Sequence, residues 1–216
     1  MELEYEGGKR PAAGGDNKDH GFNIKRIENT IYFSERITYD TAHVLNIILK
    51  NCELDILEEV EKVESAAKKE KSKYSVVHVD PKPIVLVLTT HGGLVHAAFS
   101  IVDTIRALRV PVHTVVSGYV ASAGTLISLA GARRTITPNS FMMIHEIRSG
   151  FWGRYSDHIV EHTNITKLMD HIISYYIAQL KVTTTREVLT DMLRRDNDLS
   201  ADECLAIGLV DAVTRT

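Results

Sequence analysis

The sequence contains few of the residues that mark a cross-linked or metal-bound small protein, with only 2 cysteines and 1 tryptophan among 216 residues. Cys52 and Cys204 form no CxxC pair, which argues against a zinc ribbon and against a disulfide framework. Hydrophobic residues make up 44% of the chain, so it can bury a full core without such links. Sparse, unpaired cysteines are typical of a reducing compartment, and we expect a cytoplasmic protein.

Strong net charge and an apolar leader are also lacking. The chain has 25 basic and 28 acidic residues, and a balance of −3 does not indicate nucleic acid or a membrane surface as partner. Residues 1–21 lack the apolar core of a signal peptide. The uncharged run Val110–Ala132 is 23 residues long, but it contains Pro111, Gly118 and Gly124. We read this run as a buried strand, turn and helix, not as a membrane span.

The length predicts one domain, with a flexible arm over residues 1–21 and a folded domain over 22–216. Apolar residues recur at helical spacing from Tyr39 onward, and this helix runs into a charged stretch at about 52–82. Seven acidic residues interleaved with lysines lie between Glu53 and Lys73. Such a pattern favours a solvated helical extension over a dedicated docking surface.

Strands, glycine turns and helices alternate through the middle of the sequence. Expected strands are Val76–Val79, Ile84–Leu88, Val112–Val116 and Phe141–Ile144, and expected helices are Leu94–Leu108, Thr125–Ala130 and Asp157–Leu180. A capping box, Ser200 to Glu203, predicts a short final helix. The alternation indicates an α/β fold with a largely parallel sheet, in which ligands bind where strands give way to helices.

Two glycine turns follow strands and could present backbone amides to a ligand. Gly92-Gly93 permits close approach of the backbone, and Ser122-Ala123-Gly124 begins a helix whose first N–H groups are unpaired. Two such amides can form an oxyanion hole, although most glycine pairs in these turns are structural. Neither GxGxxG nor GxxxxGK[ST] occurs, so nucleotide binding has no support.

A serine, a histidine and an aspartate lie at positions suited to nucleophilic catalysis. Ser122 stands between small residues at a strand-to-helix turn, His145 follows a predicted strand, and Asp196 lies in a polar loop. The elbow of an α/β-hydrolase would need glycine where Val120 stands, which argues against that fold. In a chain with 10 histidines the spacing alone leaves a triad and chance as alternatives.

The segment from His158 to His162 matches HxxEH, the pattern of an inverted zinc peptidase. Both histidines and Glu161 would share one face of the long helix. A polar helix face accommodates the same residues, so the pattern leaves both readings open.

Several segments, taken together and in order, resemble the Clp protease proteolytic subunit family over about Ile27 to Val213. The segments are Thr90–Gly93, Gly118–Gly124, Pro138–His145, Arg195–Ala201 and Gly208–Asp211. The resemblance implies a crotonase-like fold with stacked ββα units, a mostly parallel sheet and a protruding handle helix. It also implies a serine endopeptidase that forms the core of an ATP-dependent protease and degrades unfolded polypeptides inside a chamber.

The resemblance assigns a role to each candidate residue. Ser122 is the implied nucleophile, His145 the base and Asp196 the acid that orients it, and Gly93 and Ala123 supply the oxyanion amides. It implies a tetradecamer of two stacked heptameric rings, joined by the handle Asp157–Leu180.

Asp157 and Arg195 match positions that pair between rings in the family, and HxxEH becomes a handle face with no metal. No cofactor is expected in this subunit, because ATP is used by a partner AAA+ unfoldase.

Three departures from the family pattern limit what is carried over. Thr90-His91 stands where the family has Ser-Pro, the stretch 52–82 is longer than the family's link, and the N-terminal arm lacks the usual axial-loop sequence. Docking of an unfoldase therefore has no motif of its own here. A crotonase-like acyl-CoA enzyme with paired amides, a zinc peptidase and a non-catalytic adaptor of a protease ring remain the alternatives.

Overall fold

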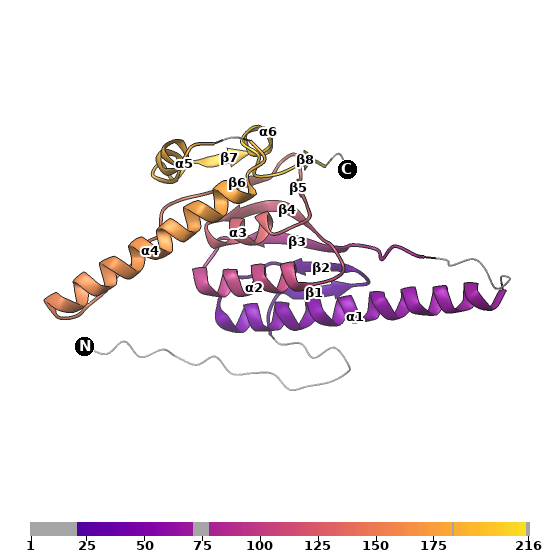
Figure 1. The fold of residues 1–216 in the computed structure, drawn as a ribbon. Helices are drawn as coiled ribbons and strands as arrows, with labels where there is room; N and C mark the ends of the chain where they lie inside the picture. The colour runs from indigo at the N-terminus through magenta and orange to yellow at the C-terminus, as the bar shows by residue number, and fades with distance from the viewer. Residues whose placement is uncertain (1–20, 71–77, 183, 215–216) are drawn as a thin grey trace.

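A sheet of eight strands with helices packed against it organises the chain in the computed structural model, which describes residues 21–70, 78–182 and 184–214 (Figure 1). The strands are β1 (Ile24–Ile27), β2 (Thr30–Phe33), β3 (Ile84–Thr90), β4 (Val112–Ala121), β5 (Arg133–Ile136), β6 (Phe141–Met143), β7 (Asp198–Ser200) and β8 (Ala212–Val213). The helices are α1 (Tyr39–Glu70), α2 (Val95–Ala107), α3 (Ala123–Leu129), α4 (Tyr155–Gln179), α5 (Arg186–Leu193) and α6 (Ala201–Ala206).

The sheet is mostly parallel, as the sequence predicts. Its main path is β1-β2-β3-β4-β5-β8, in which only the β1–β2 hairpin is antiparallel. Strand β4 changes partner along its length: residues 113–116 pair with β5, whereas 119–121 pair with β6. Gly118 lies between the two halves, where the strand changes partner. Its φ of +74° is a backbone conformation that glycine adopts readily and other residues rarely do. The fork sets β6 and its antiparallel neighbour β7 apart from the main path.

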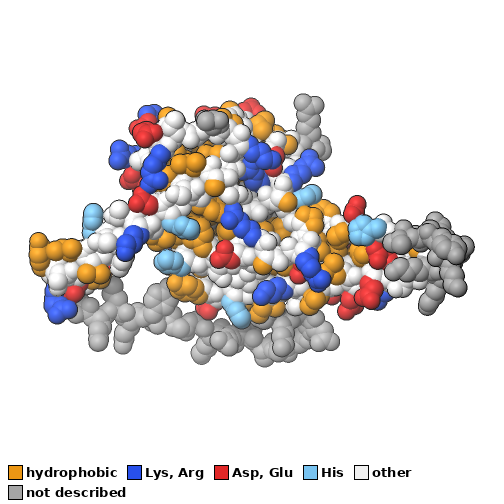
Figure 2. All heavy atoms as spheres, in the orientation of Figure 1, with side chains coloured by type: hydrophobic (Ala, Val, Ile, Leu, Met, Phe, Trp, Pro, Cys, Tyr) orange, Lys and Arg blue, Asp and Glu red, His pale blue; other side chains and the backbone are white. Residues whose placement is uncertain are grey.

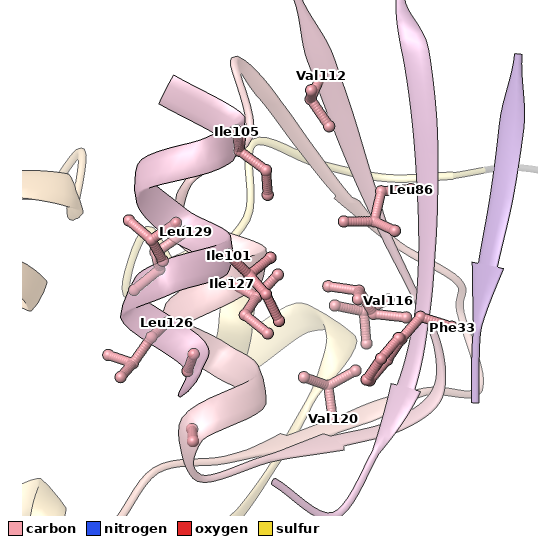
Figure 3. Packing of buried hydrophobic residues seen from close by; sticks show 14 of the residues in the cluster. Phe33, Leu86, Ile101, Ile105, Val112, Val116, Val120, Leu126, Ile127 and Leu129 are labelled. Carbon is pink, nitrogen blue, oxygen red and sulfur yellow. The ribbon is translucent and has the colours of Figure 1, made fainter. Parts of the chain in front are cut away.

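Apolar side chains of the central strands pack against α2 and α3. Val116 and Val120 of β4 face Ile101 of α2 and Ile127 of α3 across this core, and all four are fully buried (Figure 3). The predicted reading of the uncharged run Val110–Ala132 is confirmed, because it forms β4, the following turn and α3. Among the described residues, no helix has the length and apolar character needed to cross a membrane.

Two long helices extend beyond the sheet in different directions (Figure 1). Helix α4 agrees with the predicted handle, and α1 is continuous through the charged sequence as far as Glu70. Among residues 39–67 of α1, for which burial is described, the last buried residue is Ile56. The predicted helical extension is therefore confirmed to Glu70, whereas the N-terminal arm through residue 20 lies outside the described residues.

The predicted strand Val76–Val79 is not found in its described part. Residues 76 and 77 lie outside the described residues, and His78 and Val79 belong to no strand. Pro81 and Pro83 follow closely, and proline lacks the N–H that a strand ladder needs, so regular pairing begins only at Ile84.

Candidate active site

Ser122 occupies a strained turn between β4 and α3. Its φ of 56° and ψ of −127° lie in a region that few residues other than glycine adopt. The turn is fixed on two sides: the Ser122 N–H donates to Met143 O at 2.8 Å, and Ser122 O accepts from the Thr125 hydroxyl at 2.6 Å. No cap hydrogen bond engages the Ser122 hydroxyl, and the residue is partly exposed. This arrangement presents a hydroxyl on a rigid backbone, as a nucleophile requires.

The Gly92-Gly93 turn packs directly against this serine. A Cβ placed on Gly92 would lie 2.7 Å from the Ser122 Cβ and 3.1 Å from Ala123 N, and the φ of Gly92 is +90°. Only glycine fits here, for reasons of both space and backbone conformation. The sequence indicated both glycine turns, and in the structure they pack together. Gly93 follows Gly92 and Ala123 follows Ser122, so both are adjacent to the Gly92–Ser122 contact.

His145 and Ser122 follow two neighbouring parallel strands. Ala121 at the end of β4 pairs with Met143 at the end of β6. Ser122 is one residue beyond that pair and His145 is two residues beyond it, so both leave the sheet at the same edge. His145 is partly buried, and its Nδ1 is a buried atom without a hydrogen-bond partner among the described residues.

Strand β7 brings Asp196 to the same edge from the opposite direction. Met143 pairs with Asp198 at the end of the antiparallel β6–β7 ladder, and Asp196 lies in the turn two residues before β7. Asp196 has a φ of 50° and is exposed. Its carboxylate accepts a hydrogen bond from the Arg148 guanidinium. The three candidate triad residues therefore share one edge of the sheet, while the Asp196 carboxylate is engaged by Arg148, a residue that the sequence analysis did not single out.

A hollow of about 560 Å³ opens beside the Gly92-Gly93 turn. His91 and Tyr119, both of which line it, have ring centroids 5.2 Å apart. Burial and a 2.7 Å hydrogen bond to Asp198 raise the pKa of the Tyr119 hydroxyl to about 12. Thr90 and His91, which the sequence analysis noted as a departure from the family pattern, line this hollow.

The two candidate ring-contact residues are each paired within their own neighbourhood. Asp157 accepts from Arg154 at 3.1 Å, and hydrogen bonds from Arg154 to the carboxylate hold the pKa of Asp157 below its ordinary value. Arg195 donates to Asp191, one helical turn earlier. The side chains of Arg154, Asp191 and Arg195 are exposed, and that of Asp157 is 34% exposed.

The HxxEH residues lie on α4, away from the three triad candidates in sequence. The His158 ring packs edge-on against Phe151, with centroids 5.2 Å apart. Among the described residues, no group of three or more His, Cys, Asp and Glu side chains is arranged to hold a metal ion. The contact between His158 and Phe151 is one that a polar helix face accommodates.

Comparison with known proteins relates the chain to one family. A sequence model of the family described as Clp protease matches residues 38–216. A relative from Chlamydia abortus, named ATP-dependent Clp protease proteolytic subunit 1, is 36% identical over 136 residues, which is 61% of this chain and 70% of the relative. Proteins of the same name from Chlamydia pneumoniae and Chlamydia trachomatis serovar D are 37% and 35% identical, over 62% and 61% of this chain and 72% and 70% of their own lengths.

The match covers both strand ends that carry Ser122 and His145, the loop that carries Asp196, and the long helix α4. The mixed α/β architecture with its mostly parallel sheet agrees with this relationship. None of these findings favours an acyl-CoA enzyme, a zinc peptidase or an adaptor. The chain belongs to the Clp protease family and is a peptidase, a hydrolase that acts on peptide bonds.

Proposed function

We propose that Ser122, His145 and Asp196 form the catalytic triad of this serine endopeptidase. One observation carries the assignment: Ser122 and His145 leave adjacent parallel strands at one edge of the sheet, and Asp196 lies two residues before β7, which pairs with β6 at that edge. A nucleophile, a base and an orienting acid from three separate segments rarely converge without a shared task.

The roles follow from the chemistry of the three side chains. The Ser122 hydroxyl attacks the carbonyl carbon of the scissile bond, while His145 accepts its proton and then delivers it to the leaving amine. Asp196, once bonded to the imidazole, holds the tautomer and stabilises the charged ring. A water molecule activated by His145 then releases the acyl group from Ser122.

Gly93 and Ala123 are the proposed oxyanion donors. Both belong to the two turns that pack together at the Gly92–Ser122 contact. Backbone amides held by such contacts need no reorganisation when negative charge develops on the carbonyl oxygen, and each donor of this type is typically worth about 3 kcal/mol of barrier. We expect unfolded polypeptide to bind in an extended form beside this turn, mainly by main-chain hydrogen bonds.

We further propose that the subunit works as the core of a two-ring assembly fed by an ATP-using AAA+ unfoldase. The names of the relatives support a partnership with ATP hydrolysis. An exposed apolar group near the start of α4 supports self-association, because a patch of this kind normally has a partner surface. Its residues and exposed fractions are Phe151 43%, Trp152 95%, Tyr155 83% and Ile159 53%.

Figure 2 shows hydrophobic side chains gathered at the projecting end of α4. In two stacked heptameric rings this end would meet the opposite ring, with Asp157 and Arg195 exchanging their present partners for one another. The subunit itself needs no cofactor on this proposal.

A cytoplasmic location is part of the same proposal. Both cysteines are buried free thiols, and burial raises the pKa of Cys204 to about 12, which keeps it protonated and unreactive.

Labelling with a fluorophosphonate probe, followed by mass analysis of the modified peptide, tests the triad directly. We expect label on Ser122 in the wild-type chain, none in Ser122→Ala, and cleavage of a fluorogenic peptide by the wild-type chain alone. Absence of label together with thioester-processing activity would favour the acyl-CoA alternative. Absence of both activities from an intact assembly would favour the adaptor.

A further inference from the structure

Two ion pairs and one backbone hydrogen bond join the segment after His145 to the end of α5 and the loop before β7. The Glu146 N–H donates to Leu193 O at 3.0 Å, and Arg194 Nε lies 3.3 Å from Glu146 Oε1. Arg148 is bonded to Asp196 two residues farther along each segment. Neither residue of the Glu146–Arg194 pair has a proposed role in catalysis. The Arg148–Asp196 pair, in contrast, engages the proposed catalytic acid.

While the Asp196 carboxylate is bonded to Arg148, one ring nitrogen of His145 has no hydrogen-bond partner among the described residues. His145 Nδ1 is buried and has no hydrogen-bond partner among the described residues, although the contacts of Glu146 with Leu193 and Arg194 bring the segment that carries Asp196 beside His145. Buried ring nitrogens in folded proteins are normally hydrogen-bonded. The unpaired Nδ1 and the Arg148–Asp196 pair therefore have one explanation: the acid is bonded to Arg148 and not to the base.

The competition between the two donors depends on charge. Arg148 gives a charge-assisted hydrogen bond to the Asp196 carboxylate, whereas the N–H of a neutral imidazole is an uncharged donor. In the resting enzyme the guanidinium is therefore the stronger partner. The Arg148 and Asp196 side chains are 73% and 43% exposed, so water and salt weaken their bond, and the acid can be recovered without unfolding.

We propose that Arg148 is a positioning residue that withholds the Asp196 carboxylate from His145, and that its release completes the triad. The proposal rests on the triad assignment above. It makes Arg148 a restraint on catalysis even though its side chain is not required for the chemistry.

The first experiment measures the rate of Ser122 labelling by a fluorophosphonate against pH in the full assembly. We expect Arg148→Gln to raise the rate by up to about fivefold near neutral pH, the factor for an exposed ion pair worth about 1 kcal/mol. The midpoint of the rising limb should move to higher pH, because a bonded carboxylate raises the pKa of an imidazole. Added salt should accelerate the wild-type chain but not the variant.

Glu146→Gln is the matched control, because it breaks the neighbouring ion pair of the same two segments. It should leave the pH midpoint in place, since Asp196 keeps its present partner. Combining Arg148→Gln with Asp196→Asn should remove the effect of the first substitution. A pH shift that persists in the double variant would mean that Arg148 acts through its charge alone, and this result would overturn the proposal. An unchanged midpoint in Arg148→Gln would also overturn it.

NMR of protein that carries labelled histidine makes the same comparison without any reaction at Ser122. The ring resonances of His145 are assigned with the variant His145→Gln. We expect the Nδ1–H resonance of His145 to lie farther downfield in Arg148→Gln than in the wild-type chain, because this N–H then donates to the Asp196 carboxylate. If Ser122 fails to label but this shift appears, the triad assignment fails and the restraint stands. If Ser122 labels and the shift is absent, the restraint alone is wrong.

Discussion

The two halves of the candidate site are held by different forces. Ser122 lies on a turn clamped between Gly92 and Met143, above strand residues such as Val120 that are fully buried. Asp196 lies on an exposed loop whose contacts to the His145 segment are two exposed ion pairs and one backbone bond. Packing fixes the nucleophile, whereas solvent-accessible charge sets the position of the acid.

This difference locates the adjustable part of the enzyme. Close-packed elements have few alternative arrangements, so the nucleophile and its oxyanion amides stay in place under most conditions. Exposed ion pairs contribute little free energy and exchange partners readily, so the acid loop can respond to salt, to assembly or to a neighbouring carboxylate. Substitutions in the first half should therefore abolish activity, whereas substitutions in the ion pairs that hold the acid loop should modulate it.

Ser122→Ala should have the largest effect, a loss of about a millionfold in peptide cleavage, with the assembly intact, because it removes a hydroxyl from a turn without removing core volume. Asp196→Asn should cost less, about ten-thousandfold, since the acid orients the base and does not bond to substrate. Adding His145→Ala to Ser122→Ala should cause little further loss. Fluorogenic peptide turnover by each purified variant gives these ratios, and substantial cleavage by Ser122→Ala would refute the triad.

Gly92→Ala should reduce cleavage by at least about a hundredfold. A methyl group there would lie 2.7 Å from both the Ser122 Cβ and Ala121 O, and displacement of the nucleophile by about 1 Å has a cost of this size. Gly150→Ala is the control, because a Cβ at Gly150 meets nothing within 4 Å. Peptide turnover measured beside a thermal unfolding curve separates local damage from loss of fold, and equal activity of the two variants would contradict the packed-turn argument.

Asp157→Ala tests whether assembly controls the acid loop. If Asp157 and Arg195 pair between rings, the variant should form smaller particles and cleave peptide about a hundredfold more slowly, since Arg195 adjoins Asp196. Analytical ultracentrifugation beside a peptide assay measures both quantities, with Glu161→Ala on the same helix as a control. Full-sized particles with normal activity, or single rings that cleave normally, would show that the loop does not depend on this contact.

Asp211→Asn tests a buried ion pair of the same chemistry as the exposed Arg148–Asp196 pair. The Arg134 side chain is only 3% exposed and bonds Asp211 Oδ1 at 2.6 Å. Removing the carboxylate charge leaves a buried cation without its partner, and we expect a loss of about 3 kcal/mol in the free energy of unfolding. Arg148→Gln should lose less than about 1 kcal/mol by the same urea measurement. Equal losses would mean that burial does not separate the two pairs.

The pH dependence of the Asp211 contribution has a defined sign. Burial alone would raise its pKa, but hydrogen bonds from Arg134 and Lys181 lower it to about 2. A carboxyl whose folded pKa is depressed stabilises the fold above its unfolded pKa, near 3.9, and loses that contribution as pH falls toward the folded value. The stability gap between the wild-type chain and Asp211→Asn should therefore persist at neutral pH and shrink between about pH 4 and pH 2.

Local sequence patterns predicted the parts of the fold that local interactions determine. The Ser200–Glu203 capping box is present, with the Ser200 N–H bonded to Glu203 at 2.8 Å, and α4 occupies the expected range within two residues. Strand β4 runs five residues past its predicted end at Val116, because pairing with β6 continues it beyond Gly118. Short elements such as β1 and α5 were missed, since few residues carry their periodicity.

The candidate site could be predicted in its residues but not in its contacts. Glycine turns and the order of the motifs indicate Ser122, His145 and Asp196. The bond between Arg148 and Asp196 joins residues 48 positions apart, and it depends on how the β6–β7 pair places two loops. No local pattern encodes such a contact, nor the packing of Gly92 against Ser122, because both arise only after the sheet has formed.

The smallest expected effect comes from removing metal. The HxxEH pattern predicts two histidine ligands on one helix face, yet the His158 ring packs against Phe151, and the described residues provide no three-ligand group. Zinc peptidases need three protein ligands and an open position for water, so this face lacks the donors for that chemistry. Incubation with a chelator should leave peptide turnover unchanged, and His158→Ala combined with His162→Ala should alter particle size at most. Metal analysis of the untreated protein provides the check: zinc at one ion per subunit, with activity lost on its removal and restored on its return, would move the catalytic assignment from the edge of the sheet to α4.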